Sequence, residues 1–243
     1  MLNKSEIKDI ASLAFKKQRD HTGLFVAEGP KIVTEFLHNI PGQIKKIYLT
    51  EEWGSNNESL LNNVAISVVS QRELERITQL KAPNQVLALL KKKEQVEPFI
   101  SNEIALYLDT IQDPGNFGTI VRIADWFGLK NIVCSEGCAD LYNAKVIQAS
   151  MASISRINVW YDTNEEWLAK QKVSILAATL NGKSIYNQQK IVEGILLIGN
   201  ESRGVRQEFL QHSRTEITIP KIGTAESLNA AVATGILLSH LIH

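Results

Sequence analysis

Three short clusters of polar residues and glycines have the residue types and spacing that could carry chemistry. The first spans residues 113–122 and contains Asn116 and Arg122, where an apolar run ends and a helical pattern begins. At about 100° per residue, Arg122 lies roughly opposite an apolar stripe, so we predict that it is not a core residue. A polar loop and an arginine at the carboxyl ends of the strands of an α/β sheet could bind a ligand. The structural alternative makes Asn116 a helix cap and Arg122 a solvated surface charge.

The second cluster, residues 197–204, directly follows an apolar strand and contains two glycines and Glu201. Glycines leave bare backbone that can approach a ligand closely, and Glu201 adds a carboxylate at the same edge of the sheet. The alternative is an ordinary strand-to-helix loop in which Glu201 pairs with Arg203 or Arg206. The residues alone leave both interpretations open.

The third cluster, residues 218–229, leads into a helix rich in alanine at residues 230–242. Ser227 and Asn229 lie at the mouth of this helix, whose small side chains permit close approach of another backbone. In the alternative interpretation, Ser227 is the N-cap of a core helix. That capping role is compatible with a functional one.

The elements that must position these clusters alternate between strand and helix. Strands are predicted at residues 104–108, 131–134, 157–160, 173–178, 195–198 and 216–219. Such alternation predicts an α/β fold with a mostly parallel sheet and helices on both faces. Thr163, with Glu166 three residues later, predicts a capping box for one of the helices.

The first part of the chain is predicted to form a separate, smaller α/β domain. Its helices are predicted at residues 5–20 and from Pro30 onward, and its strands at residues 24–27, 44–50, 66–69 and 86–90. A polar run at residues 91–97 ends in Pro98, just before the next strand. We therefore place the domain boundary between residues 1–97 and residues 98–243.

Composition narrows the class of protein. The chain has 243 residues, and 26 basic side chains balance 26 acidic ones, so the whole charge gives no hint of a nucleic-acid partner. Cys134 and Cys138 are the only cysteines and are predicted to be reduced thiols, with no metal site. Residues 1–20 do not have the pattern of a signal peptide, and the apolar runs are too short to cross a bilayer. A cytoplasmic protein without a membrane partner is predicted.

Taken together, the three clusters resemble the motifs of the SpoU/TrmH family within the SPOUT methyltransferases. The resemblance lies in Asn-x-Gly-x-x-x-Arg at residues 116–122, Gly-Asn-Glu-x-x-Gly at residues 199–204, and Ile-Pro followed by Ser-Leu-Asn ending at Asn229. Residues 25–29, Phe-Val-Ala-Glu-Gly, resemble the substrate-binding domain that many members carry in front.

The resemblance implies a fold and an activity. The activity is methylation of a ribose 2′-hydroxyl in structured RNA with S-adenosylmethionine, ribosomal RNA being favoured over transfer RNA. The fold is a small N-terminal α/β substrate-binding domain followed by an α/β sheet with a trefoil knot, one of the rare exceptions to unknotted topology. The family also implies a homodimer with its active site near the interface.

The resemblance also implies roles for individual residues. Arg122 would lie nearest the ribose hydroxyl, either deprotonating it with help from an RNA phosphate or binding that phosphate. The side chains expected to orient the ribose, Arg122 and the cofactor loops are Asn116, Glu201, Ser227 and Asn229. The residues expected to hold S-adenosylmethionine, largely by backbone groups, are Leu180, Gly199, Ile219 and Leu228.

A local basic surface is predicted to contact RNA phosphates, although the net charge of the whole chain is zero. It is expected to contain Lys16, Lys17, Arg19 and Lys31, and the alternative is a solvated helix face.

Two departures from the family pattern are Ala230-Ala231, where Val-Ser is usual, and residues 148–153, where many members have an arginine and a glycine.

Two other functions would show different properties. A non-catalytic RNA-binding protein with this fold would not bind S-adenosylmethionine. A dinucleotide-dependent oxidoreductase would need Gly-x-Gly-x-x-Gly after its first strand, which residues 115–118 do not provide.

Overall fold

The computed structural model describes residues 2–242, which divide into two compact units. The first unit comprises the chain up to Glu94 together with Tyr142–Ser155. The second comprises Gln95–Leu141 together with the chain from Arg156 onward. Residues 142–155 thus belong to the first unit, although in sequence they lie between two parts of the second. A single boundary along the sequence cannot separate the two units.

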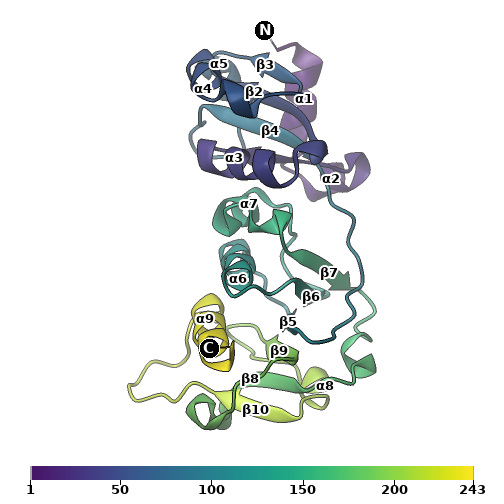
Figure 1. Cartoon of the computed structure of the whole chain (residues 1–243), viewed down its shortest axis with the longest axis vertical. Helices are drawn as coiled ribbons and strands as arrows, with labels where there is room; N and C mark the ends of the chain where they lie inside the picture. Colours follow the sequence, from purple (N-terminus) through teal and green to yellow (C-terminus); the bar gives the residue numbers. More distant parts are fainter. Residues whose placement is uncertain (1, 243) are drawn as a thin grey trace. The chain divides into compact units, whose positions relative to one another are not determined.

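The first unit is a four-stranded sheet with helices packed against it (Figure 1). The strand order is β1-β4-β2-β3, with β4 antiparallel to both of its neighbours and β2 parallel to β3. Its strands are β1 (Leu24–Glu28), β2 (Ile44–Leu49), β3 (Ile66–Val68) and β4 (Val86–Lys91). Its helices are α1 (Lys4–Ser12), α2 (Lys16–Thr22), α3 (Pro30–Asn39), α4 (Glu51–Asn56), α5 (Gln71–Leu74) and α7 (Ala144–Ser150). The predicted small α/β domain is therefore present.

The predicted single helix over residues 5–20 is wrong, because the chain breaks between α1 and α2. Arg19 is only 3% exposed, and its Nη1 donates hydrogen bonds to the carbonyls of Leu13 (2.7 Å) and Ala14 (2.9 Å). These carbonyls lie at the break, so the buried guanidinium satisfies backbone groups that a continuous helix would have satisfied itself. The prediction that Arg19 belongs to an exposed basic surface is wrong for the same reason.

The returning segment packs against β1. The Gln148 side chain donates a hydrogen bond to the Glu28 carbonyl (2.9 Å), and the rings of Phe25 and Tyr142 lie 4.7 Å apart. Ala152 is buried with a φ of 66°, a left-handed conformation that favours glycine. This segment contains residues 148–153, which depart from the family pattern, and its polar and ring contacts serve the first unit.

The second unit contains a six-stranded sheet in which every pair of neighbours is parallel, in the order β10-β8-β9-β5-β6-β7. Its strands are β5 (Ile104–Leu108), β6 (Asn131–Ser135), β7 (Asn158–Asp162), β8 (Ile175–Ser184), β9 (Gly194–Ile198) and β10 (Thr215–Thr218). Its helices are α6 (Pro114–Trp126), α8 (Gln207–Leu210) and α9 (Ala230–Ile242). The six predicted strands and the α/β class are confirmed.

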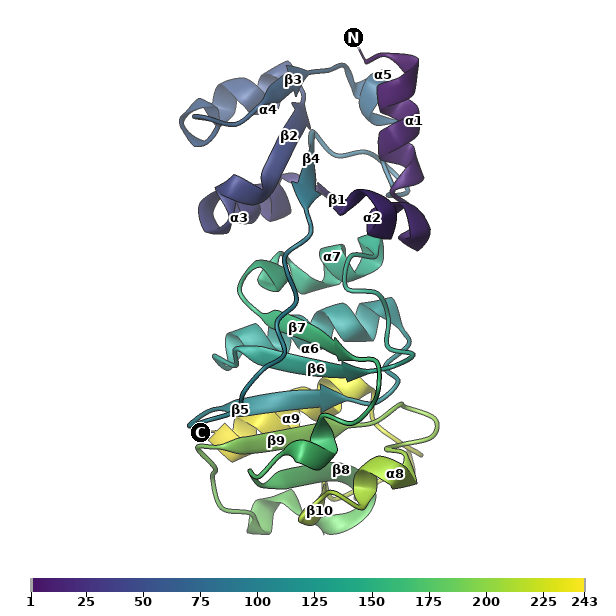
Figure 2. The same cartoon turned by 90° about the vertical axis from the view of Figure 1, so that its right-hand side faces the viewer.

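Helices cover both faces of this sheet. Helices α6 and α9 lie side by side on one face, and α8 lies on the other (Figure 2). On the α8 face, a buried cluster includes Tyr107, Trp167, Leu197 and Phe209. No helix within residues 2–242 is long and apolar enough to cross a membrane.

The predicted capping box at Thr163 is wrong. The backbone amides of Glu166 (3.3 Å) and Trp167 (2.9 Å) donate instead to the carboxylate of Asp162, at the end of β7. Only a short 3-10 turn, Leu168–Lys170, follows. A single buried carboxylate thus orders this connection.

Glu28, at the end of β1, is a buried carboxylate whose ionisation opposes folding. It accepts hydrogen bonds from the Thr78 hydroxyl (2.5 Å) and the Gln79 amide (2.7 Å). Burial nevertheless raises the pKa of Glu28 above its ordinary value of 4.5. The stabilisation linked to its proton is therefore complete below the ordinary pKa and is lost as the pH rises through the raised pKa.

We predict that Glu28→Gln stabilises the protein more at about pH 8 than at about pH 5, because glutamine cannot ionise. The measurement is the difference in Tm between variant and wild type at the two pH values. Glu75→Gln, on an exposed residue after α5, is the control and should show no such trend. An equal Tm difference at both pH values would contradict the prediction.

Candidate functional site

The three polar clusters meet through a relay of two asparagine amides and one carboxylate. Asn229 donates from Nδ2 to Oδ1 of Asn116 (2.8 Å), and Asn116 donates from Nδ2 to Oε1 of Glu201. An amide offers both a donor and an acceptor, so Asn116 joins the other two side chains in a fixed direction. Residues from the starts of α6 and α9 and from the loop after β9 therefore lie within hydrogen-bonding distance.

Helix caps hold both asparagines in place. Asp113 is the N-cap of α6, and its carboxylate accepts from the backbone amide of Asn116 (2.8 Å). The side chain of Asn116 is therefore left for the relay. Asn229 caps α9 through Oδ1, which accepts from the amides of Ala231 (3.0 Å) and Val232 (3.2 Å). The structural alternatives, in which Asn116 or Ser227 is the cap, do not hold.

Glu201 lies in a loop closed on itself. Asn200 and Gly204 exchange two backbone hydrogen bonds, of 3.1 and 2.8 Å. Gly199 is required because a Cβ there would lie 2.2 Å from the carbonyl carbon of Gly204. The loop presents Glu201 to Asn116, so the alternative pairing of Glu201 with Arg203 or Arg206 is not what the structure contains.

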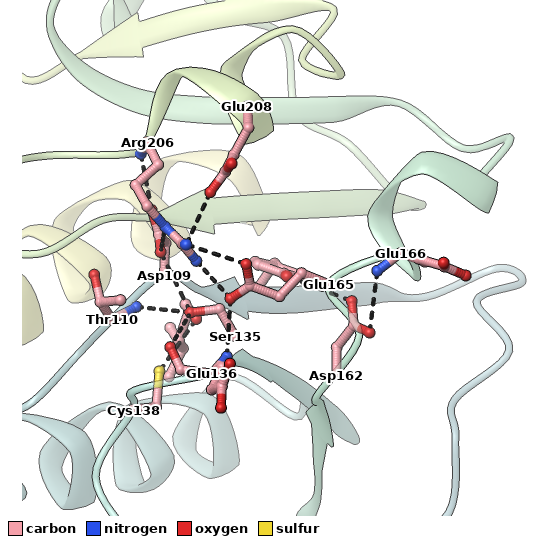
Figure 3. A network of polar contacts seen from close by, with 12 residues as sticks. Asp109, Thr110, Ser135, Glu136, Cys138, Asp162, Glu165, Glu166, Arg206 and Glu208 are labelled. Atoms are coloured by element: carbon pink, nitrogen blue, oxygen red, sulfur yellow. Dashed lines mark hydrogen bonds and ion pairs between the residues drawn. The ribbon is translucent and has the colours of Figure 1, made fainter.

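A second polar network lies at the ends of β5, β6 and β7 (Figure 3). Asp109 is fully buried after β5 and accepts from both the backbone amide and Nε of Arg206, each at 2.8 Å. Arg206 also donates to Glu165 (2.6 and 3.1 Å) and pairs with the exposed Glu208 (2.8 Å). The hydrogen bond to Glu165, followed by that to Asp109, raises the pKa of Arg206 above its ordinary value.

Sequence reasoning did not identify this network. Asp109 and Arg206 are 97 residues apart, and the local sequence suggests Arg206 only as a partner of Glu201. The one signal in the sequence is the position of Asp109 directly after an apolar strand, where a carboxylate is costly unless it is paired.

Arg122 and Ser227 are near these residues in the chain but are not part of the relay. Arg122 is exposed on α6, and it makes no hydrogen bond or ion pair with any residue from 2 to 242. The prediction that Arg122 is not a core residue is confirmed. Ser227 is exposed two residues before Asn229, and no hydrogen bond of its side chain occurs within the described chain.

Of the four residues expected to hold a cofactor, Gly199 and Ile219 directly follow β9 and β10, Leu180 lies within β8, and Leu228 lies just before α9. Between β8 and β10 the register breaks, because Glu216 opposes Ala177 whereas Ile217 opposes Lys183. Residues 178–182 therefore bulge from the ladder, leaving Leu180 71% exposed. The Leu180 carbonyl accepts from the Thr218 hydroxyl (3.3 Å), next to Ile219.

The bulge also contains an unused polar group. The hydroxyl of Thr179 is buried and has no hydrogen-bond partner among residues 2–242. A buried hydroxyl without a partner is uncommon and suits a bound polar ligand. Gly199 follows β9 directly, and Leu228 lies in the exposed segment before α9. These features fit a cofactor held through backbone groups and a few hydroxyls.

The lysines expected to contact phosphates are exposed in the first unit. Lys16 forms an ion pair with Asp20 (2.6 Å), which partly offsets its charge. Lys17 on α2 and Lys31 on α3 are exposed as well. Only Arg19 is excluded from such a surface, because it is buried.

Two family models match the chain, one in each of its two parts. The SpoU rRNA Methylase family matches residues 103–239, and the MRM3-like substrate binding domain matches residues 4–88. A Bacillus subtilis protein named 23S rRNA (guanosine(2553)-2′-O)-methyltransferase RlmP is 31% identical to the chain over 240 residues. The match covers 97% of this chain and 95% of that protein.

Solved structures of RNA methyltransferases are also similar to the chain. A putative RNA methyltransferase of the TrmH family from Porphyromonas gingivalis is 31% identical, with a TM-score of 0.88, over 100% of this chain and 98% of its own. An AdoMet-bound rRNA methyltransferase from Sinorhizobium meliloti is 29% identical, with a TM-score of 0.84, over 99% and 95%. With its three motifs gathered at one sheet edge, the chain belongs to the SpoU rRNA Methylase family.

Proposed function

We propose that this protein transfers the methyl group of S-adenosylmethionine to a ribose 2′-hydroxyl of structured RNA, with ribosomal RNA favoured over transfer RNA. The observation that carries the proposal is the relay from Asn229 through Asn116 to Glu201, which joins the three family motifs. The Bacillus subtilis relative, named as a 23S rRNA methyltransferase, supports the choice of ribosomal RNA.

S-adenosylmethionine, when bound, supplies a methyl group on a sulfonium that is a good leaving group. The chain therefore has to align a hydroxyl and help it lose a proton. Backbone groups of Leu180, Gly199, Ile219 and Leu228 would hold the cofactor. The hydroxyl of Thr179, which has no hydrogen-bond partner among the described residues, adds a polar group for the cofactor beside Leu180.

Arg122 is the residue that we assign to the reacting ribose. Its guanidinium is exposed and pairs with no residue in the described part of the chain, so it is available to RNA. It either deprotonates the hydroxyl with help from an RNA phosphate or binds that phosphate in a bidentate way. Asn116, Glu201, Asn229 and the exposed Ser227 would orient the ribose and the loops around it.

The two parts of the chain have different tasks in this proposal. Residues 1–97 bind the RNA substrate, with phosphate contacts from the exposed Lys16, Lys17 and Lys31. Residues 98–243 carry the methyltransferase chemistry. The match of residues 4–88 to a substrate binding domain supports this assignment.

The active form in this proposal is a cytoplasmic homodimer with a trefoil knot in the methyltransferase part of each chain. Apolar side chains on α6 and α9 support a partner surface, because Trp126 is 85% exposed and Val232 and Ile236 are also exposed. Beside them is a cavity of about 380 Å³, lined by Tyr186, Gly235, Ile236, Ser239 and His240. A second copy of the chain would cover these side chains.

The purified protein should transfer labelled methyl from S-adenosylmethionine to a ribose 2′-hydroxyl, because the relay gathers all three motifs. The measurement is nucleoside analysis of ribosomal RNA and transfer RNA from a strain that lacks the gene, after incubation with the protein. Label found only on bases would show that the reaction assignment is wrong.

Arg122→Ala should abolish methylation while folding and cofactor binding survive. Arg122 is outside the core, so its truncation opens no cavity, and an interaction formed mainly in the transition state contributes about a hundredfold or more in rate. Arg122→Lys should recover little, because lysine lacks the planar bidentate geometry.

Single-turnover methylation, calorimetric cofactor titration and thermal melting measure the three properties separately. Lys130→Ala removes an exposed positive charge just beyond α6 and is the matched control. Near-normal methylation by Arg122→Ala would return Arg122 to the status of a surface charge.

Replacing Lys16, Lys17 and Lys31 with alanine should weaken RNA binding and flatten its salt dependence without changing cofactor affinity. Each lost phosphate contact lowers the slope of log affinity against log salt by about 0.7–0.9. The control replaces Lys8, Lys45 and Lys81, three other exposed lysines of the first unit. An unchanged slope in the first variant would contradict the basic-surface assignment.

A further inference from the structure

The loop that carries Glu201 is attached at both ends to two consecutive residues that follow β5. At its start, the Asn200 side chain donates to the Thr110 carbonyl (2.9 Å). At its far end, Arg206 donates its backbone amide and its Nε to the two carboxylate oxygens of Asp109, each at 2.8 Å. Glu201 lies between these attachments, so its position depends on both.

Both anchors are themselves held firmly. Asp109 is fully buried, and its Oδ1 also accepts from the Ser135 hydroxyl (3.3 Å). Thr110 has a φ of 52°, which β-branched residues rarely adopt. Its amide donates to Ser135 (2.9 Å) and its carbonyl accepts from Asn200, so bonds on both sides hold this unfavourable conformation.

The other end of the Arg206 side chain reaches the turn after β7 (Figure 3). Nη2 and Nη1 donate to the two oxygens of Glu165 at 2.6 and 3.1 Å. Glu165 also accepts from the Glu136 amide (3.1 Å), just after β6. The planar guanidinium thus connects the end of the Glu201 loop to the ends of three strands, which a lysine could not do with the same geometry.

We propose that Arg206, anchored by Asp109 and Glu165, is a positioning residue for methyl transfer. It sets the loop of residues 199–204 so that Glu201 meets Asn116, and it acts through Glu201 without touching the reacting atoms. The inference rests on the proposed function for its kinetic consequence, whereas the anchoring of the loop can be measured in the protein alone.

The test compares Arg206→Ala, Arg206→Lys and Glu165→Gln with a matched control, Glu166→Gln. Glu166 is the next residue in the same turn, and it pairs with the exposed Lys170 (2.9 Å) on the surface. Three properties are measured well below the Tm of each variant: amide hydrogen exchange of residues 199–204, cofactor affinity, and single-turnover methylation over a range of RNA concentrations. Thermal melting reports the global stability. Asp109→Asn is avoided as the main variant because Asp109 is fully buried.

Arg206→Ala should speed exchange at the backbone amides of Asn200 and Gly204 by at least about tenfold, since each of these amides donates to the carbonyl of the other residue across the loop. Its single-turnover rate at saturating RNA should fall by about 10–100-fold. Removing a residue that only orients a functional side chain has an effect of this size at metal sites. The RNA concentration at half-maximal rate should stay within about twofold. Arg206→Lys and Glu165→Gln should change in the same direction by less, and Glu166→Gln should match the wild type.

Two results would overturn the inference. One is a wild-type methylation rate in Arg206→Ala with unchanged exchange in the loop. The other is exchange that rises uniformly through the second unit with a lowered Tm, while the rate at low temperature stays that of the wild type; the network would then serve stability alone. A wild-type protein that methylates no RNA would instead overturn the proposed function, and the loop exchange would still decide whether Arg206 anchors the loop.

Discussion

The structure of the second unit depends on one constraint, which is that its six strands are parallel. In a parallel sheet all carboxyl ends lie at one edge, and each connection must return across a face of the sheet before the next strand begins. Residues far apart in sequence, such as Asn116, Glu201 and Asn229, can therefore become neighbours. The same edge also gathers Asp109 and Arg206, so the relay and the network around Arg206 share one geometric origin.

The chemistry of the relay explains why two of its members are amides. Asn116 uses its oxygen toward Asn229 and its nitrogen toward Glu201, and a carboxylate at this position would place two anions beside each other. Asn229 likewise uses its oxygen to cap α9 and its nitrogen to reach Asn116. Each amide is thus satisfied at both ends, which makes the contact directional and resistant to a flip.

Much of the fold could be predicted from the sequence, because strands and helices follow local patterns. The apolar runs that became β5, β9 and β10 are short and bounded by turns, and the stripe on α6 correctly left Arg122 at the surface. Errors occurred where one distant or buried group overrides the pattern. Arg19 satisfies two carbonyls at the break between α1 and α2, and Asp162 accepts from the Glu166 backbone amide that a capping box at Thr163 would have used.

By itself, the sequence determined the class of fold, the family and the identity of the motif residues, because periodicity and motif spacing are local properties of the chain. Only the tertiary structure decided which of those residues touch: that Asn116 bridges Asn229 and Glu201, that Arg206 binds Asp109, and that Tyr142–Ser155 packs with the first unit. The three side-chain contacts join residues more than 80 positions apart. They depend on the order of the strands and on the need of each buried polar group for a hydrogen-bond partner. Neither can be read from the local spacing of residues.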